Sequence, residues 1–591
     1  MTSTDAATDR QAGTPDIPQV AEQPTTSPDE LDRAVAVVAG AAPGWVTSDL
    51  PRRLALLEQA RGDTLAAAED WVLAAQVAKG ISRDQRAMGD EWLGGPALVA
   101  RNLRLLHQTL TDVVTTGRPQ PPRIEQRDDG RTVVHVLPAD GRDRLLLPRR
   151  TGQVVMREGV TVAEVESRIG EVHRDGHEPP HEGEVAVVLG AGNVSSIPPM
   201  DVLAQLYGHL RTVVLKMSPV NDWLAPHLRR ALRAFVDADL VRIVSGGRDE
   251  GAHLVGHDDV AAVHVTGSDR THDAIVFGTG EEGARRRAAD EPVMTKTFTA
   301  ELGNVSPVIV VPGPWTDDDL AAQGDTIASM LVNNGGFNCV AARVVVTHVH
   351  WNRRGRLLDA VRASLAEAED RQAWYPGAEE RHRELVASHD RVEGFGGTAP
   401  GSLPFTLLAD LDPSDTGHLA FTHEAFCGVF GEVGLDAPRS VVDYLEEAVD
   451  FANDVLWGTL SASILVHPRS LRDPAIRDAV ERAIDRLEYG TVVVNDWGGT
   501  AYGTVVLPWG GAPGRSRTDI QSGTGFVHNT WLLPDDLVEK SVLRSPFRPT
   551  PGRITSHTHA RSAEVGRLLT EFEATGRTSL MARLAVAAAR G

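Results

Sequence analysis

Hydrophobic positions follow a helical rhythm through the first part of the chain. Between residues 29 and 116, apolar side chains such as Leu54, Leu57 and Trp71 recur at helix-like spacing between charged positions, so this region is expected to be helical. The segment before it, residues 1–29, is polar and rich in Thr, Asp and Pro. It has little to bury, which predicts a disordered tail.

Short apolar runs predict β-structure between residues 131 and 162. Residues 132–137 and 154–156 have the composition of strands. The run at 145–147, which follows a turn at 139–141, is expected to be a further strand.

From residue 184 onward the pattern alternates strand, loop and helix. Buried-type strands are expected at 185–189, 213–216, 241–244 and 260–265, and a second alternating stretch runs from 307 to 495. Strands that alternate with helices imply parallel sheets with right-handed crossovers. The predicted fold class is therefore α/β.

Size and charge narrow the functional classes. At 591 residues the chain exceeds a single hydrophobic core, so two or three domains are expected. The formal net charge is −22, whereas nucleic acid and anionic membranes bind basic faces, so neither is an expected partner. No apolar run reaches the ~18 residues of a membrane span, and residues 1–30 lack the features of a secretory signal. A cytoplasmic enzyme is expected.

The two cysteines, Cys339 and Cys427, argue against a disulfide framework and against a Cys-based zinc site, and no metal ligands are predicted. Cys339 lies in the glycine-rich stretch 334–339, downstream of Glu301 in a second such stretch, 301–304. A scarce thiol with a carboxylate is what a nucleophile and its general base need. Taken alone, however, a buried inert thiol is the commoner case.

The strand-to-helix turn Gly190–Ser195 approximates a dinucleotide fingerprint, with Ser in place of the third Gly. A tight turn without a ligand fits it equally well. Within it, the Asn193 amide can donate a hydrogen bond to a developing oxyanion. Lys216 ends a strand, where it can reach a ribose or phosphate, and Gly267-Ser268 ends another, where backbone and a helix N-terminus favour anions.

The order of these residues resembles the aldehyde dehydrogenase superfamily, over roughly residues 30–550. No single motif is decisive, but the ordered set is specific. It continues downstream with Glu424-Ala425-Phe426, Ala452-Asn453-Asp454, Trp457-Gly458, Gly490–Asn495 and Pro508-Trp509-Gly510-Gly511.

The resemblance implies a role for each site residue. Cys339 is similar to the thiolate that attacks the aldehyde. Asn193 and the Cys339 backbone N–H are similar to the oxyanion hole. Glu301 is similar to the base that activates water. The cofactor-binding residues implied in the same way are Lys216, Gly267, Ser268, Glu424 and Phe426. The implied cofactor is NAD or NADP, and the implied partner is a small-molecule aldehyde.

The chain also departs from the family pattern. The acid that pairs with the adenosine ribose is missing from Met217-Ser218-Pro219, which makes NADP at least as plausible as NAD. Phe337 precedes the nucleophile in place of Gln, where it either narrows the mouth or packs, and Arg343 comes one position early.

Three readings of function compete. The first is oxidation of an aldehyde to a carboxylic acid through a thiohemiacetal and a thioester. The second is a coenzyme A-acylating aldehyde dehydrogenase or acyl-CoA reductase that uses the same cysteine; Glu301 favours hydrolysis over this reading. The third is a binding or structural relative that has lost its chemistry, and the presence of Asn193, Glu301 and Cys339 together argues against it.

The resemblance also suggests how the chain divides. A Rossmann-like cofactor domain is expected at 30–125 and 180–295, an α/β catalytic domain at 296–510, a β oligomerisation arm at 126–179 and 520–550, and a C-terminal extension at 551–591 with a helix-like end. Through the arm, a homodimer or homotetramer is expected.

Overall fold

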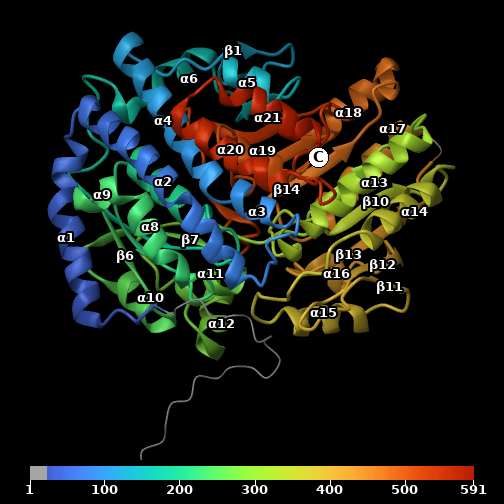
Figure 1. The fold of residues 1–591 in the computed structure, drawn as a ribbon, viewed down its shortest axis with the longest axis horizontal. Coiled ribbons are helices and arrows are strands. Elements are labelled where there is room, and N and C mark those ends of the chain that lie inside the picture. Colours follow the sequence, from blue (N-terminus) through green and yellow to red (C-terminus); the bar gives the residue numbers. More distant parts are fainter. Residues whose placement is uncertain (1–22, 439) are drawn as a thin grey trace, which may run out of the picture.

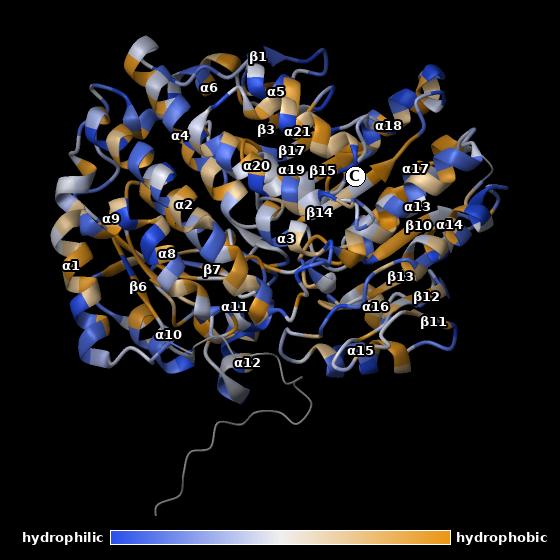
Figure 2. Ribbon diagram, viewed as in Figure 1, coloured by the Kyte–Doolittle hydropathy of each residue, from blue (hydrophilic) through white to orange (hydrophobic). Residues whose placement is uncertain are grey.

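Two β-sheets organise the chain in the computed structural model, which describes residues 23–438 and 440–591 (Figure 1). The predicted tail lies mostly outside the described residues; within them, the first helix already begins at Pro28. Figure 2 shows the strands of both sheets largely in the hydrophobic colour, while the outer helices alternate between the two colours. The strands are therefore buried and the helices amphipathic, as parallel sheets require.

The first sheet has six strands. Its core is parallel, and only β16 runs antiparallel, against β8. In spatial order the strands are β16 (Gly523–Thr524), β8 (Thr297–Glu301), β7 (Val260–Thr266), β4 (Val185–Leu189), β5 (Thr212–Lys216) and β6 (Val241–Val244).

The second sheet has eleven strands. Its centre is parallel from β17 to β12, while β1, β2 and β3 at one end and β11 at the other pair antiparallel. In spatial order the strands are β1 (Arg123–Gln126), β2 (Thr132–Leu137), β3 (Thr151–Met156), β17 (Val538–Arg544), β15 (Thr491–Val494), β14 (Ser461–Leu465), β9 (Pro307–Val310), β10 (Val344–His348), β13 (Val429–Leu435), β12 (Phe405–Leu411) and β11 (Val392–Phe395).

Helices accompany both sheets. Those of the chain up to β8 are α1 (Pro28–Val46), α2 (Leu50–Ala78), α3 (Met88–Leu93), α4 (Pro96–Thr116), α5 (Gly141–Leu146), α6 (Val162–Arg168), α7 (Ile197–Leu203), α8 (Ala225–Ala231), α9 (Arg233–Asp237), α10 (Arg248–Gly256), α11 (Asp269–Val276) and α12 (Gly280–Ala289). Those after it are α13 (Asp317–Val332), α14 (Arg354–Ala366), α15 (Ala378–Ala387), α16 (Leu419–Thr422), α17 (Val441–Asp454), α18 (Pro474–Arg486), α19 (Gly498–Thr504), α20 (Ser562–Thr575) and α21 (Leu580–Ala589). No helix in the described part of the chain is long and apolar enough to cross a membrane.

The α/β fold class predicted from the sequence is confirmed. The strand predicted at 145–147 is wrong, because α5 covers 141–146. The Asp140 carboxylate accepts hydrogen bonds from the backbone N–H groups of Arg142 and Asp143, both at 2.9 Å. This N-cap starts a helix where the apolar run suggested a strand.

The domain boundaries stay a prediction, but strand pairing shows which sheet the segments at two of them join. The predicted boundary at 296 falls one residue before β8, which pairs with β7 in the first sheet. The predicted arm segment 520–550 contributes to both sheets, as β16 to the first and as β17 to the second.

The C-terminal extension packs on the N-terminal helices through a buried charge cluster, with α20 lying against α3 and α4. Glu573 on α20 is fully buried and accepts hydrogen bonds from Arg101, at 3.0 Å, and from Arg104. Arg101 also pairs with the buried Asp143 at 2.7 Å. The extension is thus part of the folded core.

Removing one carboxylate from this cluster should destabilise the protein strongly. Glu573→Gln leaves two buried guanidinium groups short of negative charge, and we expect a loss of ~3–5 kcal/mol in the free energy of unfolding, measured by urea denaturation. The control is Glu571→Gln on the same helix, whose pair with the exposed Arg577 is worth at most about 1 kcal/mol. Equal losses in both variants would contradict the assignment.

Candidate active site

One cavity of about 1400 Å³ gathers every site residue predicted from the sequence. They reach it from the ends of strands of the first sheet and from loops that lead into the second. The residues are Asn193, Lys216, Gly267, Ser268, Glu301, Cys339, Glu424 and Phe426. The structure thus brings all eight together, although their roles stay proposals.

Cys339 is placed by a turn that follows α13. The helix ends at Val332, and Asn334, Gly335 and Gly336 then adopt φ values of 53°, 68° and 83°. A Cβ at Gly336 would lie 2.6 Å from the Cys427 carbonyl oxygen. Glycine is therefore needed there both for its positive φ and for the close approach of the two backbones.

Arg343 holds this turn in place from inside the protein. Its guanidinium donates hydrogen bonds to the carbonyl oxygens of Gly336 and Cys427, both at 2.7 Å, and to that of Asn338 at 3.2 Å. The side chain is 2% exposed, and burial lowers its pKa. The sequence pattern shows Arg343 only one position earlier than in the family and does not predict this role.

A second buried cation, Lys79, forms a hydrogen bond with the turn that carries Cys339. Lys79, at the C-terminal end of α2, donates to the Asn193 carbonyl oxygen at 3.1 Å, to Asn334 Oδ1 at 3.0 Å and to Glu91 at 2.9 Å. It is 3% exposed. It couples the turn of Asn193 to the turn of Cys339, a role that its place in a helical pattern did not suggest.

The Asn193 amide points at the nucleophile loop. Its Nδ2 donates to the Phe337 carbonyl oxygen at 2.9 Å. This bond uses one of the two amide hydrogens, so the other is available to a substrate oxygen.

Glu301 lies at the end of β8, with its Oε1 3.6 Å from Cys339 Sγ. Burial, reinforced by the negative charge of Asp201, raises the pKa of Glu301 to about 7. Burial and the nearby carboxylates of Glu301 and Glu424 raise the pKa of the Cys339 thiol well above its usual value. The thiol is therefore protonated at neutral pH and needs a base, and a base stands within reach.

Glu424 and Phe426 line the same cavity. A Cβ at Gly303 would lie 2.2 Å from Glu424 Oε2, so the glycine makes room for the carboxylate. Burial raises the pKa of Glu424 to about 7, although the charge of Arg343 opposes this. Phe337 is 2% exposed, with its ring 6.3 Å from that of Phe426, and therefore packs in the core.

The remaining residues lie at the strand ends of the first sheet. Lys216 ends β5, and burial lowers its pKa. Ser268 caps α11, with its Oγ accepting from the Thr271 N–H at 3.2 Å. A Cβ at Gly267 would lie 3.7 Å from Val265 Cγ2, an ordinary van der Waals contact, and Gly267 lines the cavity.

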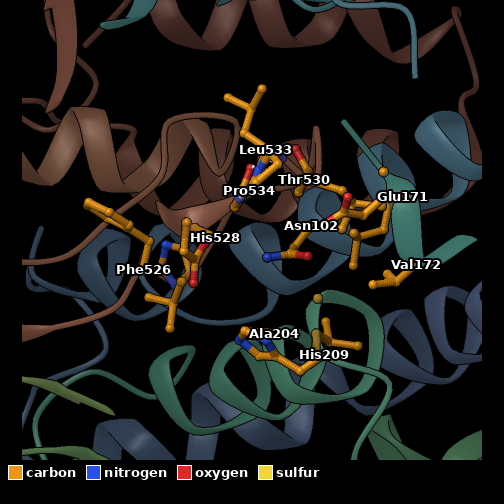
Figure 3. Close-up of a pocket in the computed structure, with 18 of the residues that line it drawn as sticks. Asn102, Glu171, Val172, Ala204, His209, Phe526, His528, Thr530, Leu533 and Pro534 are labelled. Atoms are coloured by element: carbon orange, nitrogen blue, oxygen red, sulfur yellow. Dashed lines mark hydrogen bonds between the residues drawn. The ribbon is translucent and has the colours of Figure 1, made fainter. Parts of the chain in front are cut away.

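A second cavity, of about 330 Å³, lies between α4, the end of α7 and the segment 526–536 (Figure 3). Figure 3 places Asn102 between His528 on one side and Glu171 and Val172 on the other. In the described part of the chain, no group of three or more His, Cys, Asp or Glu side chains could hold a metal ion.

Comparison with known proteins finds similarity to aldehyde dehydrogenases. The model of the aldehyde dehydrogenase family matches residues 207–384. An aldehyde dehydrogenase of Enchytraeus buchholzi is 26% identical over 319 residues, which are 51% of this chain and 56% of that relative. The sequence is thus similar to aldehyde dehydrogenases over part of its length. The match spans only about half the length of this curated relative.

Solved aldehyde dehydrogenases share the fold over almost the whole chain. An NADP-dependent glyceraldehyde-3-phosphate dehydrogenase from Bacillus halodurans C-125, complexed with NADP, has a TM-score of 0.58 at 17% identity and covers 88% of this chain and 92% of its own. An indole-3-acetaldehyde dehydrogenase complexed with NAD⁺ has a TM-score of 0.58 at 18% identity and covers 90% of this chain and 93% of its own.

The two cysteines should differ sharply in the rate at which an alkylating reagent modifies them. Cys339 lines the large cavity, whereas Cys427 is fully buried behind Arg343. We expect iodoacetamide to modify Cys339 at least about tenfold faster than Cys427, measured by peptide mass spectrometry over time. Cys339→Ser should remove the fast phase and Cys427→Ser should keep it; the reverse pattern would show that the thiol at 339 is not accessible.

Proposed function

We propose that this protein catalyses the NAD(P)-dependent oxidation of an aldehyde to a carboxylic acid, with Cys339 as nucleophile and Glu301 as general base. The observation that carries the proposal is the 3.6 Å approach of Glu301 Oε1 to Cys339 Sγ at one cavity. A protonated thiol beside a carboxyl group with a pKa of about 7 is matched to proton transfer at neutral pH.

In the first step the thiol proton passes to Glu301 while the sulfur attacks the aldehyde carbon. This gives a thiohemiacetal on Cys339, and the negative charge develops on the former aldehyde oxygen. The free Nδ2–H of Asn193 and the backbone N–H of Cys339 would donate to that oxygen. Such donors are fixed before the reaction begins, which is why they stabilise the charge effectively.

The second half of the reaction breaks a C–H bond and then a C–S bond. A bound nicotinamide cofactor would supply the hydride acceptor, and loss of hydride from the thiohemiacetal carbon would leave a thioester on Cys339. Glu301 releases the thiol proton to solvent and, ionised again, removes a proton from water while the hydroxide adds to the thioester carbon; the sulfur then leaves and takes that proton back from Glu301 as the acid forms. One aldehyde, one water and one oxidised cofactor are consumed, and one acid, one reduced cofactor and one proton are produced.

The residues present fit a nicotinamide dinucleotide. The turns after β4 and β7 and the capped start of α11 meet at the carboxyl edge of a parallel sheet, where dinucleotides bind. Lys216 and Ser268 would hold the ribose and the pyrophosphate, and Glu424 and Phe426 the nicotinamide end. Structural relatives complexed with NADP and with NAD⁺ support either nucleotide.

A coenzyme A-acylating reaction is the second candidate. It would use the same sulfur and the same thioester but pass the acyl group to a thiol instead of water. The buried Glu301 beside the sulfur favours water. A cytoplasmic location and assembly as a homodimer or homotetramer stay predictions from the sequence.

Cys339→Ala should abolish turnover because no covalent intermediate can form. We expect kcat to fall by a factor on the order of 10³ or more, while the Kd of NAD or NADP, measured by fluorescence titration, changes little. An aldehyde panel with each nucleotide supplies the assay. Wild-type kcat in this variant would exclude the mechanism, whereas Cys427→Ala should retain activity.

Glu301→Gln should separate hydride transfer from hydrolysis. We expect a burst of reduced nucleotide followed by slow steady turnover, because the thioester no longer has a base to activate water.

In the wild type the hydrolytic rate should rise with pH through about 7, since Glu301 must be ionised to accept a proton. Repeating the assay with coenzyme A tests the second candidate: acceleration of the wild type by the thiol, with acyl-CoA as product, would replace hydrolysis by acyl transfer.

A further inference from the structure

A second carboxyl group lies beside Glu301 on the same sheet face. Strands β7 and β8 are in register, with Thr266 opposite Glu301 and His264 opposite Thr299. Side chains of facing residues in neighbouring strands project from the same face. Asp201 of α7 lies over this face and accepts a hydrogen bond from Thr266 Oγ1 at 2.9 Å. Asp201 is thus anchored to the strand position next to Glu301.

Both carboxyl groups are buried. Asp201 is 0% exposed and Glu301 3% exposed. Within the described residues, Asp201 Oδ1 is buried without a hydrogen bond, and neither carboxyl group forms an ion pair with Lys or Arg. The His264 ring lies near Asp201, with its Nε2 3.6 Å from Asp201 Oδ2. The Cys339 thiol and the Trp509 indole are hydrogen-bond donors to Glu301, and the charge of Asp201 raises the pKa of Glu301.

We infer that Asp201 is a positioning residue for the reaction at Cys339 and forms with Glu301 an acid pair in which the charge of Asp201 makes Glu301 a stronger base. The inference rests on the proposed function for the role of Glu301. When a proton passes from Cys339 or water to Glu301, the repulsion between Glu301 and the charge of Asp201 is relieved. Glu301 is therefore a stronger base than an isolated glutamate would be.

The other groups around the pair are compatible with this role. Cys339 and Tyr502, whose pKa values are both raised well above their usual values by burial, are neutral near pH 7. Beyond Asp201, burial lowers the pKa of His528 to about 4, so its imidazole is uncharged there too. His528 lies at the second cavity (Figure 3) and packs edge-on against Tyr502, with a distance of 4.3 Å between the ring centroids. Two further titratable groups have their own variants below: His264 on β7, and Glu424, which acts on Cys339 and has a pKa of about 7.

The test is the pH dependence of iodoacetamide alkylation at Cys339, which needs neither aldehyde nor cofactor. The wild-type rate should carry an inflection near pH 7 that Glu301→Gln removes. In Asp201→Asn, an isosteric change that removes one charge, the inflection should move down by about one pH unit. In Thr266→Val, which removes the hydrogen bond to Asp201 but keeps the charge of Asp201, the inflection should stay in place. Thr266→Ser keeps the donor and should leave the inflection in place. In Glu424→Gln the inflection should remain, and its loss there would assign the inflection to Glu424 instead of Glu301.

These shifts distinguish an electrostatic role from a structural one. Asp201→Asn and Thr266→Val both disturb the contact between these two side chains, but only Asp201→Asn removes a charge, so an effect of packing would move the inflection in both variants. An unchanged inflection in folded Asp201→Asn, or an equal downward shift in Thr266→Val, would overturn the pair, as would an inflection that survives Glu301→Gln but disappears in His264→Gln. If the wild-type inflection persists in Glu301→Gln, the base in the proposed function fails; if only the Asp201→Asn shift is missing, the pair alone fails.

Discussion

The position of the Cys339 sulfur depends on a turn whose backbone is held by groups outside it. Asn334, Gly335 and Gly336 all lie in the left-handed region, which a chain does not adopt in succession without support. Arg343 supplies that support on one side and Lys79 on the other, and each makes several hydrogen bonds from a buried position. Two buried cations are costly, and they are retained here because backbone and amide oxygens satisfy them.

The same burial that fixes the turn sets the chemistry of the site. Removing water from the cavity wall raises the pKa values of Cys339, Glu301 and Glu424 together, because each charged form is disfavoured. A permanently ionised sulfur would need a cation to stabilise it. The surroundings of Cys339 instead favour the neutral thiol with a basic carboxyl group at 3.6 Å, so the nucleophile is generated as the proton moves.

The sequence could predict the fold and the membership of the site to a large extent, for a specific physical reason. In parallel sheets, ligand-binding groups gather at the carboxyl ends of strands, so Lys216 and Gly267 could be placed once the strands were recognised, whereas the strand that ends at Glu301 was not predicted. The α5 helix was missed because its apolar run is short and its N-cap lies before it. Lys79 was missed because its partner Asn193 is 114 residues away in sequence, a distance that no local pattern bridges.

The geometry of acid and thiol finally depends on how the two sheets are joined. Glu301 belongs to a strand of the first sheet, while Cys339 lies between two strands of the second. Ser522 bridges them: its Oγ donates to the Gly303 carbonyl oxygen at 2.8 Å and accepts from the Thr459 N–H at 2.7 Å, just before β14. Next to it, Gly523 pairs with Glu301 in β16, and the chain then continues into β17 of the second sheet. A small shift of one sheet against the other would open the gap between sulfur and carboxylate, so this short crossing segment sets the distance on which the proton transfer depends.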